Sequence, residues 1–445
     1  MVSYGSEEWP VDVLQRTCII AIFSTLFLSG HKSIHASIST RSSEGANGPL
    51  SLSSDSPHLS ATYVSPLSFT VSPAASAGTT PIQDTKTTFR APNQEAKALE
   101  KKITSLSLSP AGSLLAVSSF HSQSVTILST GTTISTARTL QGHKAHVNAV
   151  KIFPSGQVVI SASGDMSAKV WDVATGQCGA SLVAHTGGVT DVAIVARGRN
   201  VLTSSRDATV RLWSLASPST PLRTVLSLPA DPVNRISLAT LNPPTSENTL
   251  SGEVETGGKV IWCGSESGRV VAVDLSNPGA RTTGSDGIAG AVAALRLPGR
   301  SQGVTALVSS PGHGLLAAGG SDGLIGVWDV RNMKTPLLAL PFTRTPAPIT
   351  SLTMLSLPNP TLLVATGDGQ CSLVSLRTSV SPPEGETDYP WALFPVVTDE
   401  LVGQDTEAIG GCAVGGWDGR GGEIWTGAED GIVRKYELRG VGGAH

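Results

Sequence analysis

Short stretches of alternating apolar and polar residues recur from Ile103 to the C-terminus, and each ends in a Gly, Asp or Pro turn. The clearest unit, Gly142–Asp172, contains the segments HVNAVKIFPSG, QVVISASGD and AKVWD. The next unit repeats it with GVTDVAIVARG, NVLTSSRD and TVRLWS, and a third, Gly303–Asp329, reads GVTALVSSPG, LLAAGGSD and LIGVWD. Alternation with a period of two over about four to eight residues is typical of half-buried strands. The pattern therefore predicts an all-β protein built from repeats of short strands.

A common register gives the number of repeats. In the best units an Asp in a tight turn precedes a Trp by six residues, as Asp165 precedes Trp171 and Asp207 precedes Trp213. Tyr436 and Val374 take the place of this Trp in two other units, and serine replaces the Asp in two more. The seven turn positions, called anchors below, are Ser122, Asp165, Asp207, Ser267, Asp322, Asp368 and Asp430. The shortest spacings, 42 and 43 residues, match the period of about 40–45 residues of WD40 repeats.

Seven anchors predict seven four-stranded blades around a central channel, which is the architecture of a WD40 β-propeller. We expect this all-β, seven-bladed propeller to occupy residues 96–445. The longer anchor spacings predict inserted loops, and the sequence is rich in turn residues at Asn242–Gly258, Asn277–Ile288 and Ser381–Pro390.

The N-terminal region, residues 1–95, has a different texture. Ser33–Pro92 is dominated by Ser, Thr, Pro, Gly and Ala, a composition that buries too little apolar surface to offset the entropy of ordering, so we expect a largely flexible region. Short strand-like segments remain at Tyr63–Val71 and Thr87–Arg90. Too little chain follows Tyr436 for an outer strand on the last blade, so we expect an upstream strand to complete it. Thr87–Arg90 is our candidate.

Composition narrows the class of function. The 445 residues carry a net charge of −3, without the basic surplus that non-specific nucleic-acid binding needs. Five scattered cysteines form no C-x-x-C pair, which argues against a disulfide framework or a zinc site. Cys18–Leu28 is apolar but too short to span a bilayer. Acidic residues before it disfavour a signal peptide, although a secreted propeller remains an alternative. We expect a monomer in the cytoplasm and nucleus, with no membrane partner.

Polar residues around the best anchors resemble the hydrogen-bonded tetrads of WD40 blades, with Ser161 or Ser163 and Thr203 or Ser205 as the hydroxyl members. A Ser/His/Asp set could also be catalytic. However, the same register recurs in two neighbouring blades, whereas an active site would be unique, so we interpret the sets as structural. No P-loop or metalloprotease motif is present, and we expect no catalytic, cofactor or metal site. The two predicted structural sets are His143, Asp165 and Trp171, and His185, Asp207 and Trp213.

The turns between second and third strands lie on one face of a propeller, and the residue before each anchor projects there. We expect these residues, together with the acidic anchors of the later blades, to form a partner-binding surface. The face should be acidic over the later blades and could steer a basic partner. The alternative is that the turn aspartates are architectural and the glutamates merely solvated. The predicted residues are Arg206, Glu266, Asp322, Asp368, Glu429 and Asp430.

Several segments are more specific than a generic WD40 repeat. The sequence resembles the proteasomal ATPase-associated factor family at Phe153–Gly156, at Asp191–Trp213, at Gly367–Cys371 and at Asp430–Leu438, whereas the first hundred residues depart from that pattern. The resemblance implies a non-catalytic chaperone that binds AAA ATPase subunits during assembly of the base of the 19S proteasome regulatory particle. The alternative is a substrate receptor of a cullin-type ubiquitin ligase, because such receptors dock their adaptor with a W-D-x-R ending like Trp328–Arg331.

Overall fold

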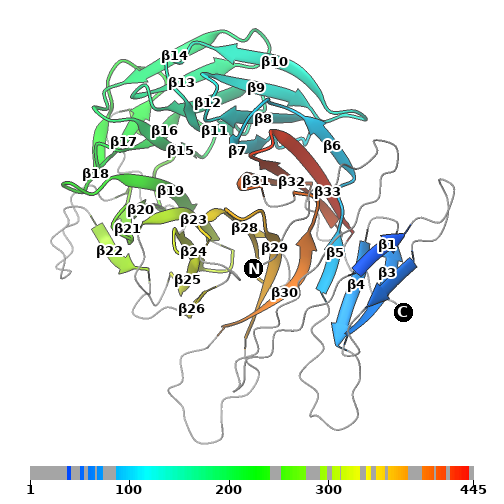
Figure 1. Cartoon of the computed structure of the whole chain (residues 1–445). Helices are drawn as coiled ribbons and strands as arrows, with labels where there is room; N and C mark the ends of the chain where they lie inside the picture. The colour runs from blue at the N-terminus through cyan, green and yellow to red at the C-terminus, as the bar shows by residue number, and fades with distance from the viewer. Residues whose placement is uncertain are drawn as a thin grey trace, which may run out of the picture. The chain divides into compact units, whose positions relative to one another are not determined.

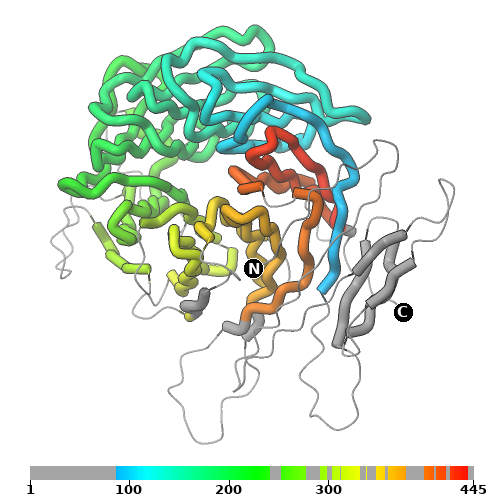
Figure 2. Tube along the Cα trace, in the orientation of Figure 1, coloured from blue at the N-terminus to red at the C-terminus, as the bar shows by residue number. Residues whose placement is uncertain are grey.

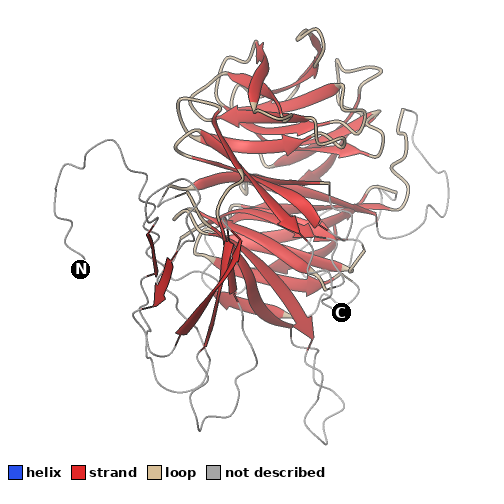
Figure 3. Cartoon of the chain, turned by 90° about the vertical axis from the view of Figure 1, so that its right-hand side faces the viewer, coloured by secondary structure: helices blue, strands red, loops and turns tan. Residues whose placement is uncertain are grey.

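The computed structural model divides the chain into two compact units, Met1–Arg90 and Ala91–His445, which are described separately. It contains strands, turns and loops, and no helix in the described residues (Figure 3). The described residues are 38–41, 51–54, 59–65, 68–73, 87–240, 252–276, 291–297, 303–310, 312–330, 337–341, 347–355, 359–378, 393–404, 407–416 and 421–439.

The first unit contains short antiparallel strands. β1 (Ile38–Arg41) pairs with β2 (Ser51–Ser54). β3 (Leu59–Ser65) pairs with β4 (Ser68–Pro73), and β4 also pairs with β5 (Thr87–Arg90). The strand-like segments expected at Tyr63–Val71 and Thr87–Arg90 are thus confirmed as strands. The flexibility expected for the rest of this region falls on residues outside the described ones.

The second unit is a ring of antiparallel sheets in which consecutive strands are neighbours (Figure 1). The first three blades consist of β7 (Ile103–Leu108), β8 (Leu114–Ser119), β9 (Ser124–Ser129) and β10 (Ser135–Gln141); β11 (Val147–Ile152), β12 (Val158–Ser163), β13 (Ser167–Asp172) and β14 (Cys178–Val183); and β15 (Val189–Val195), β16 (Asn200–Ser205), β17 (Thr209–Ser214) and β18 (Arg223–Ser227).

The remaining blades follow in chain order. They consist of β19 (Val233–Thr240), β20 (Lys259–Ser265), β21 (Arg269–Asp274) and β22 (Ala291–Arg296); β23 (Val304–Ser310), β24 (Leu315–Gly320), β25 (Leu324–Asp329) and β26 (Leu338–Pro341); β27 (Ile349–Leu355), β28 (Thr361–Thr366), β29 (Cys371–Thr378) and β30 (Leu393–Leu401); and β31 (Ile409–Gly415), β32 (Gly421–Ala428) and β33 (Ile432–Arg439), with β6 (Gln94–Lys97) on its outer edge.

The first strand of each blade is the innermost one. It contacts the first strand of the next blade, and β31 contacts β7, so the ring closes. All seven anchors lie in the turns between second and third strands, as Asp165 does between β12 and β13. The seven-bladed propeller is therefore confirmed. The inserted loops expected at Asn277–Ile288 and Ser381–Pro390, and most of Asn242–Gly258, lie outside the described residues.

The last blade is completed by a strand from upstream of β7. β6 pairs antiparallel with β33, with Val433 opposite Ala96 and Arg434 opposite Glu95 (Figure 2). Completion by an upstream strand was expected, but the choice of Thr87–Arg90 was wrong, because that segment pairs with β4. The sequence Gln94–Lys97 has no apolar alternation because this outer edge strand is held by backbone pairing and keeps its side chains half-buried or exposed.

Neighbouring blades pack through one repeated position. The first residue of every inner strand is β-branched and fully buried, and these residues are Ile103, Val147, Val189, Val233, Val304, Ile349 and Ile409. Each faces a small residue in the second strand of the preceding blade. A Cβ added at Gly264 would lie 2.5 Å from Val304 Cγ1, and one at Gly319 would lie 2.6 Å from the Ile349 side chain. The same strand position holds Ser118, Ala162, Ser204, Ala365 and Gly427 in the other blades.

The second residue of the inner strand adds a hydrogen bond to the next blade. At five consecutive junctions its side chain donates to the backbone carbonyl of the β-branched residue that begins the following blade. The bonds are Thr104 to Val147 at 2.9 Å, Asn148 to Val189 at 2.7 Å, Thr190 to Val233 at 2.6 Å, Asn234 to Val304 at 3.2 Å and Thr305 to Ile349 at 2.6 Å. Each of these five junctions thus combines a buried β-branched side chain with a directional hydrogen bond to the same residue.

Removal of β6 should loosen the closed ring. A chain that begins at residue 100 loses the antiparallel pairing with β33 and leaves an open sheet edge, so its unfolding midpoint should fall by about 5 °C or more. Thermal unfolding followed by circular dichroism measures this, with a chain that begins at Thr87 as the matched control. Equal midpoints for the two chains would show that β6 does not hold the ring closed.

Candidate protein-binding face

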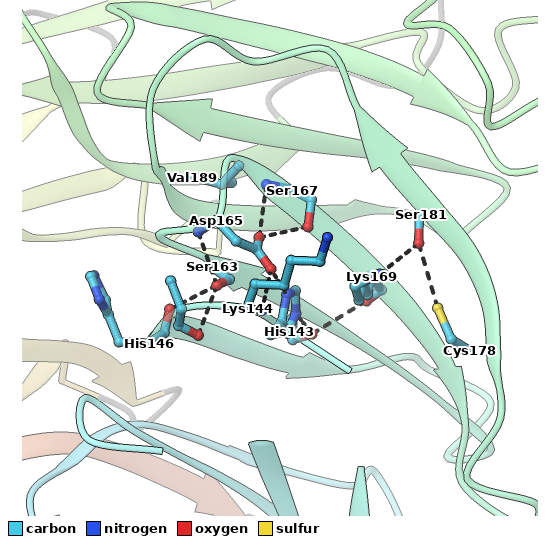
Figure 4. A network of polar contacts seen from close by, with 12 residues as sticks. His143, Lys144, His146, Ser163, Asp165, Ser167, Lys169, Cys178, Ser181 and Val189 are labelled. Atoms are coloured by element: carbon cyan, nitrogen blue, oxygen red, sulfur yellow. Dashed lines mark hydrogen bonds and ion pairs between the residues drawn. The ribbon is translucent and has the colours of Figure 1, made fainter. Parts of the chain in front are cut away.

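Two sets of loops lie on the same side of the propeller. They are the turns that contain the anchors and the connections that lead from the outer strand of one blade to the inner strand of the next. We call this side the anchor face. Below it, in the second blade, His143 Nδ1 lies 2.8 Å from Asp165 Oδ2 (Figure 4). His143 Nε2 lies 2.7 Å from Ser161 Oγ, and Trp171 donates its indole N–H to Ser161 over 2.8 Å.

The third blade repeats this geometry. His185 Nδ1 lies 2.8 Å from Asp207 Oδ2, His185 Nε2 lies 2.8 Å from Thr203 Oγ1, and the indole N–H of Trp213 donates to Thr203 over 2.9 Å. The structure thus selects Ser161 and Thr203 as the hydroxyl members. Ser163 and Ser205 instead donate to backbone carbonyls, which are those of His146 and Gly187.

The tryptophan and the aspartate of each tetrad determine which of its atoms donate hydrogen bonds and which accept them. Trp171 can only donate, and an ionised Asp165 can only accept. A neutral His143 with its proton on Nδ1 therefore donates to Asp165 and accepts the Ser161 hydroxyl at Nε2. Every polar hydrogen of this tetrad then has a partner. The aspartate also accepts from the backbone N–H of Lys144 at 2.9 Å and from the Ser167 hydroxyl at 2.6 Å (Figure 4).

The pKa values agree with this assignment. Burial lowers the pKa of His143 and His185, against the raising effect of the bonded aspartates. Burial would raise the pKa of Asp165 and Asp207, but hydrogen bonds from Ser167 or Thr209, from the histidine and from a backbone N–H outweigh it and lower the pKa of each carboxyl to about 2. Each tetrad thus holds a neutral histidine beside a carboxylate.

The tetrads do not form a catalytic site. Ser161 and Thr203 are fully buried, so neither hydroxyl can meet a substrate. Each hydroxyl oxygen already accepts an indole N–H and donates its own proton to a histidine Nε2. The network instead ties the anchor turn to the third strand and to the loop that carries the histidine.

Two other blades build part of this connection from different residues, which the sequence did not indicate. In the last blade Gln404 Nε2 donates to Thr426 Oγ1 over 2.8 Å and to Tyr436 Oη over 3.1 Å, and Tyr436 donates to the Val402 carbonyl over 2.9 Å. In the fourth blade the partners are exchanged, because Asp231 precedes the inner strand and accepts the Ser267 hydroxyl over 2.6 Å. The register of Tyr436 with Trp171 was visible in the sequence, but nothing marked Gln404.

The predicted face residues lie where expected, in the anchor turns, but most of their carboxylates have partners within the chain. Asp322 accepts from the backbone N–H of Leu324, and Asp368 accepts from the Thr366 hydroxyl. Asp430 accepts from Ile432 N–H and from Arg434. Exposed groups on the face include Arg206 and Glu266, the latter 2.6 Å from Asn234 Nδ2, and the half-buried Glu429 pairs with Lys102.

A shallow pocket opens on the anchor face where the last and first blades meet. Its volume is about 720 Å³. Its lining residues are Lys97, Glu100, Lys101, Lys102, Phe120, His121, Glu407, Glu429 and Asp430. The sequence had indicated the two acidic anchor-turn residues but not the lysines of the connection, because no repeat covers that segment.

The described part of the chain contains neither a metal-ligand group nor a membrane-spanning helix. No group of three His, Cys, Asp or Glu side chains in it could hold a metal ion. No helix there is long and apolar enough to cross a membrane. The Gly-rich segment before β20 is a docked loop, in which the buried Glu253 pairs with Arg223 at 2.6 Å.

Comparison with known proteins identifies WD40 repeats. The family WD domain, G-beta repeat matches residues 134–172, 176–214 and 293–329, about a quarter of the chain. A stretch of 41 residues is 51% identical to the nuclear distribution protein nudF of Aspergillus flavus and of Aspergillus oryzae, and spans only 9% of this chain and 9% of each relative. WD40 propellers serve as non-catalytic scaffolds for protein partners, and this chain has that architecture.

The tetrads predict a dependence of stability on pH. An aspartate with a pKa of about 2 stabilises the folded state above about pH 4, and this contribution is lost as the pH falls from about 4 to about 2. Histidines buried in the neutral form add a loss below about pH 6.5. In the double variant Asp165→Asn/Asp207→Asn we expect a free energy of unfolding about 2–4 kcal/mol lower at pH 7.

In the same variant the free energy of unfolding should change less between pH 4 and pH 2. It should still decrease below pH 6.5, because the buried histidines are unchanged. Urea unfolding followed by tryptophan fluorescence from pH 2 to pH 8 measures both effects. Glu100→Gln, a change of one exposed carboxylate outside the tetrads, is the control. An unchanged slope below pH 4 in the double variant would contradict the assignment of the aspartates.

Proposed function

We propose that this scaffold is an assembly chaperone of the proteasome regulatory-particle base, and that its anchor face binds AAA ATPase subunits in the cytoplasm and nucleus. The observation that carries the proposal is the resemblance of Asp191–Trp213 to the proteasomal ATPase-associated factor family. No nucleotide chemistry is assigned to this chain. Its role is to hold a partner surface during assembly and then to release it.

The residues behind the resemblance make contacts that a generic WD40 repeat does not need. Asp191 is buried and accepts the backbone N–H of Ile236 in the next blade over 3.0 Å. Asn200 is fully buried, accepts the N–H of Val254 over 2.6 Å and donates to the Gly252 carbonyl over 3.2 Å. These contacts join the third and fourth blades and dock the inserted loop. We do not assign partner contacts to these residues.

The charges of the later blades favour a partner with a basic surface. Glu266 and Glu407 are exposed on the anchor face, and Glu429 lies at the rim of the pocket. Because Lys102 neutralises part of this charge, the attraction is moderate, and its main effect is on the rate and orientation of encounter.

The ubiquitin-ligase alternative has weaker support. Trp328 and Val330 of its W-D-x-R motif are buried in the core between the fourth and fifth blades. Arg331 lies outside the described residues. The similarity to nudF has the length of a single repeat, so it supports the repeat and not a role in nuclear distribution.

Affinity purification of the native full-length chain tests the proposal. Mass spectrometry should recover AAA ATPase subunits of the regulatory particle, and the double reversal Glu266→Lys/Glu429→Lys should weaken their binding about threefold to tenfold. The exchange Lys102→Glu/Glu429→Lys keeps the ion pair and is the control. Recovery of a cullin-ligase adaptor without ATPase subunits would favour the alternative, and undiminished binding by the reversed variant would remove the acidic surface from the proposal.

A further inference from the structure

Two large apolar side chains are exposed in adjacent anchor turns. Phe120, between β8 and β9, is 48% exposed, and Met166, between β12 and β13, is 45% exposed. The other exposed large apolar residues among the described ones are Val183 and Val292, which lie in outer strands of the second and fourth blades. An apolar pair on the anchor face of the first two blades is therefore a local feature of that surface.

Aromatic and backbone contacts make this surface continuous. The Phe120 ring lies 4.5 Å from the ring of His146 and 5.6 Å from that of His121, measured between centroids. His146 in turn covers Gly164, where an added Cβ would lie 2.7 Å from the imidazole. Gly164 begins the turn that carries Met166. We call Phe120, His121, His146 and Met166 the aromatic–methionine patch.

Met166 adopts a backbone conformation that does not favour a methionine. Its φ of 65° is in the left-handed region, where a residue with a Cβ is less stable than glycine by roughly 1 kcal/mol. Four other blades have glycine at this turn position, namely Gly268, Gly323, Gly369 and Gly431. The turn itself requires this φ, since Ala208 has a φ of 66° at the same position of the third blade, so what distinguishes Met166 is its large apolar side chain exposed to solvent.

Three exposed cations lie on the anchor face of the first three blades, and the carboxylates that line the pocket beside Phe120 and His121 bound the patch on its other side. Lys101, Lys144 and Arg206 are exposed in successive segments of the anchor face. The connection before β15 joins them to the patch, since a Cβ at Gly188 would lie 3.2 Å from Gly164 Cα and one at Gly187 would lie 2.7 Å from Asp207 N. The two tetrad aspartates on this side are occupied by hydrogen bonds. Over the second and third blades the exposed charge of these segments is thus positive, whereas that of the pocket and of the later blades is mostly negative.

We infer that the aromatic–methionine patch binds an extended acidic peptide segment of a protein partner, with one apolar side chain as its anchor. The apolar side chain would pack between Phe120 and Met166, and carboxylates on either side would pair with Lys101, Lys144 and Arg206. Thioether and aromatic groups adapt to different apolar side chains, and hot spots of this kind supply most of the affinity in small interfaces. The inference rests on the proposed role as a protein-binding scaffold and names one class of ligand for it.

A random peptide display library panned on the intact protein tests the inference. Selected peptides should contain acidic residues around an apolar one. The best peptide, labelled with fluorescein, should bind about tenfold or more weakly to Phe120→Ser/Met166→Gly when measured by fluorescence anisotropy. Met166→Gly alone should raise the unfolding midpoint and still weaken binding, which separates the binding role from a structural one. Val183→Ser, at an exposed apolar position on an outer strand, is the control and should bind as the unchanged protein does.

The outcomes distinguish this inference from the proposed function. No enrichment, enrichment of basic peptides, or full affinity in Phe120→Ser/Met166→Gly would overturn the acidic-peptide site. If ATPase subunits bind equally well to that variant and to the unchanged protein, the site fails while the chaperone role stands. If the peptide binds at the patch but no ATPase subunit is recovered, the site stands and the chaperone role fails.

Discussion

The propeller depends on the junction between blades, where a β-branched residue at the start of each inner strand is buried against a small residue of the preceding blade. No strand belongs to two blades, and only loops connect one blade to the next along the chain. Side-chain packing around the channel therefore has to hold the ring together. A larger residue at Gly264 or Gly319 would meet the next blade at less than 3 Å. The hydrogen bond from the second inner-strand residue adds direction to this packing at five junctions. Interiors of this density tolerate changes of volume poorly, which makes the small residues as important as the large ones.

The last two junctions differ, and the difference explains the role of β6. Thr350 occupies the position of the donor at the sixth junction, but its buried hydroxyl has no partner. At the seventh, Gly410 occupies that position, and a Cβ there would lie 1.7 Å from the Ile103 carbonyl, so the backbones meet directly. Ring closure therefore relies on close packing of β31 against β7 and on pairing of β33 with β6. A strand from near the N-terminus compensates for junctions that have lost their side-chain hydrogen bond.

The fold could be predicted from the sequence because its signals are local and repeated. Strand alternation, turn residues and the spacing from an anchor to a tryptophan all occur within one blade, so Asp165 and Trp171 could be placed without knowledge of the ring. The closing strand could not be located, because pairing through the backbone leaves no pattern in Gln94–Lys97. Gln404 was missed for a related reason. An amide can replace histidine as the hydrogen-bond partner of a hydroxyl, and no sequence rule restricts that position to one residue type.

The tetrads also determine which groups the anchor face can offer to a partner. The two tetrad aspartates, Asp165 and Asp207, each accept three or more hydrogen bonds below the surface, so they contribute rigidity and little free charge. The groups left for binding are the neighbours of the anchors, among them Arg206, Glu266 and Met166, which lie in hydrogen-bonded turns. A rigid turn can also hold Met166 at a positive φ, because the surrounding hydrogen bonds outweigh the strain of about 1 kcal/mol. The repeated structural network thus makes possible a surface that differs from blade to blade, with an apolar and basic sector over the first blades and an acidic one over the last.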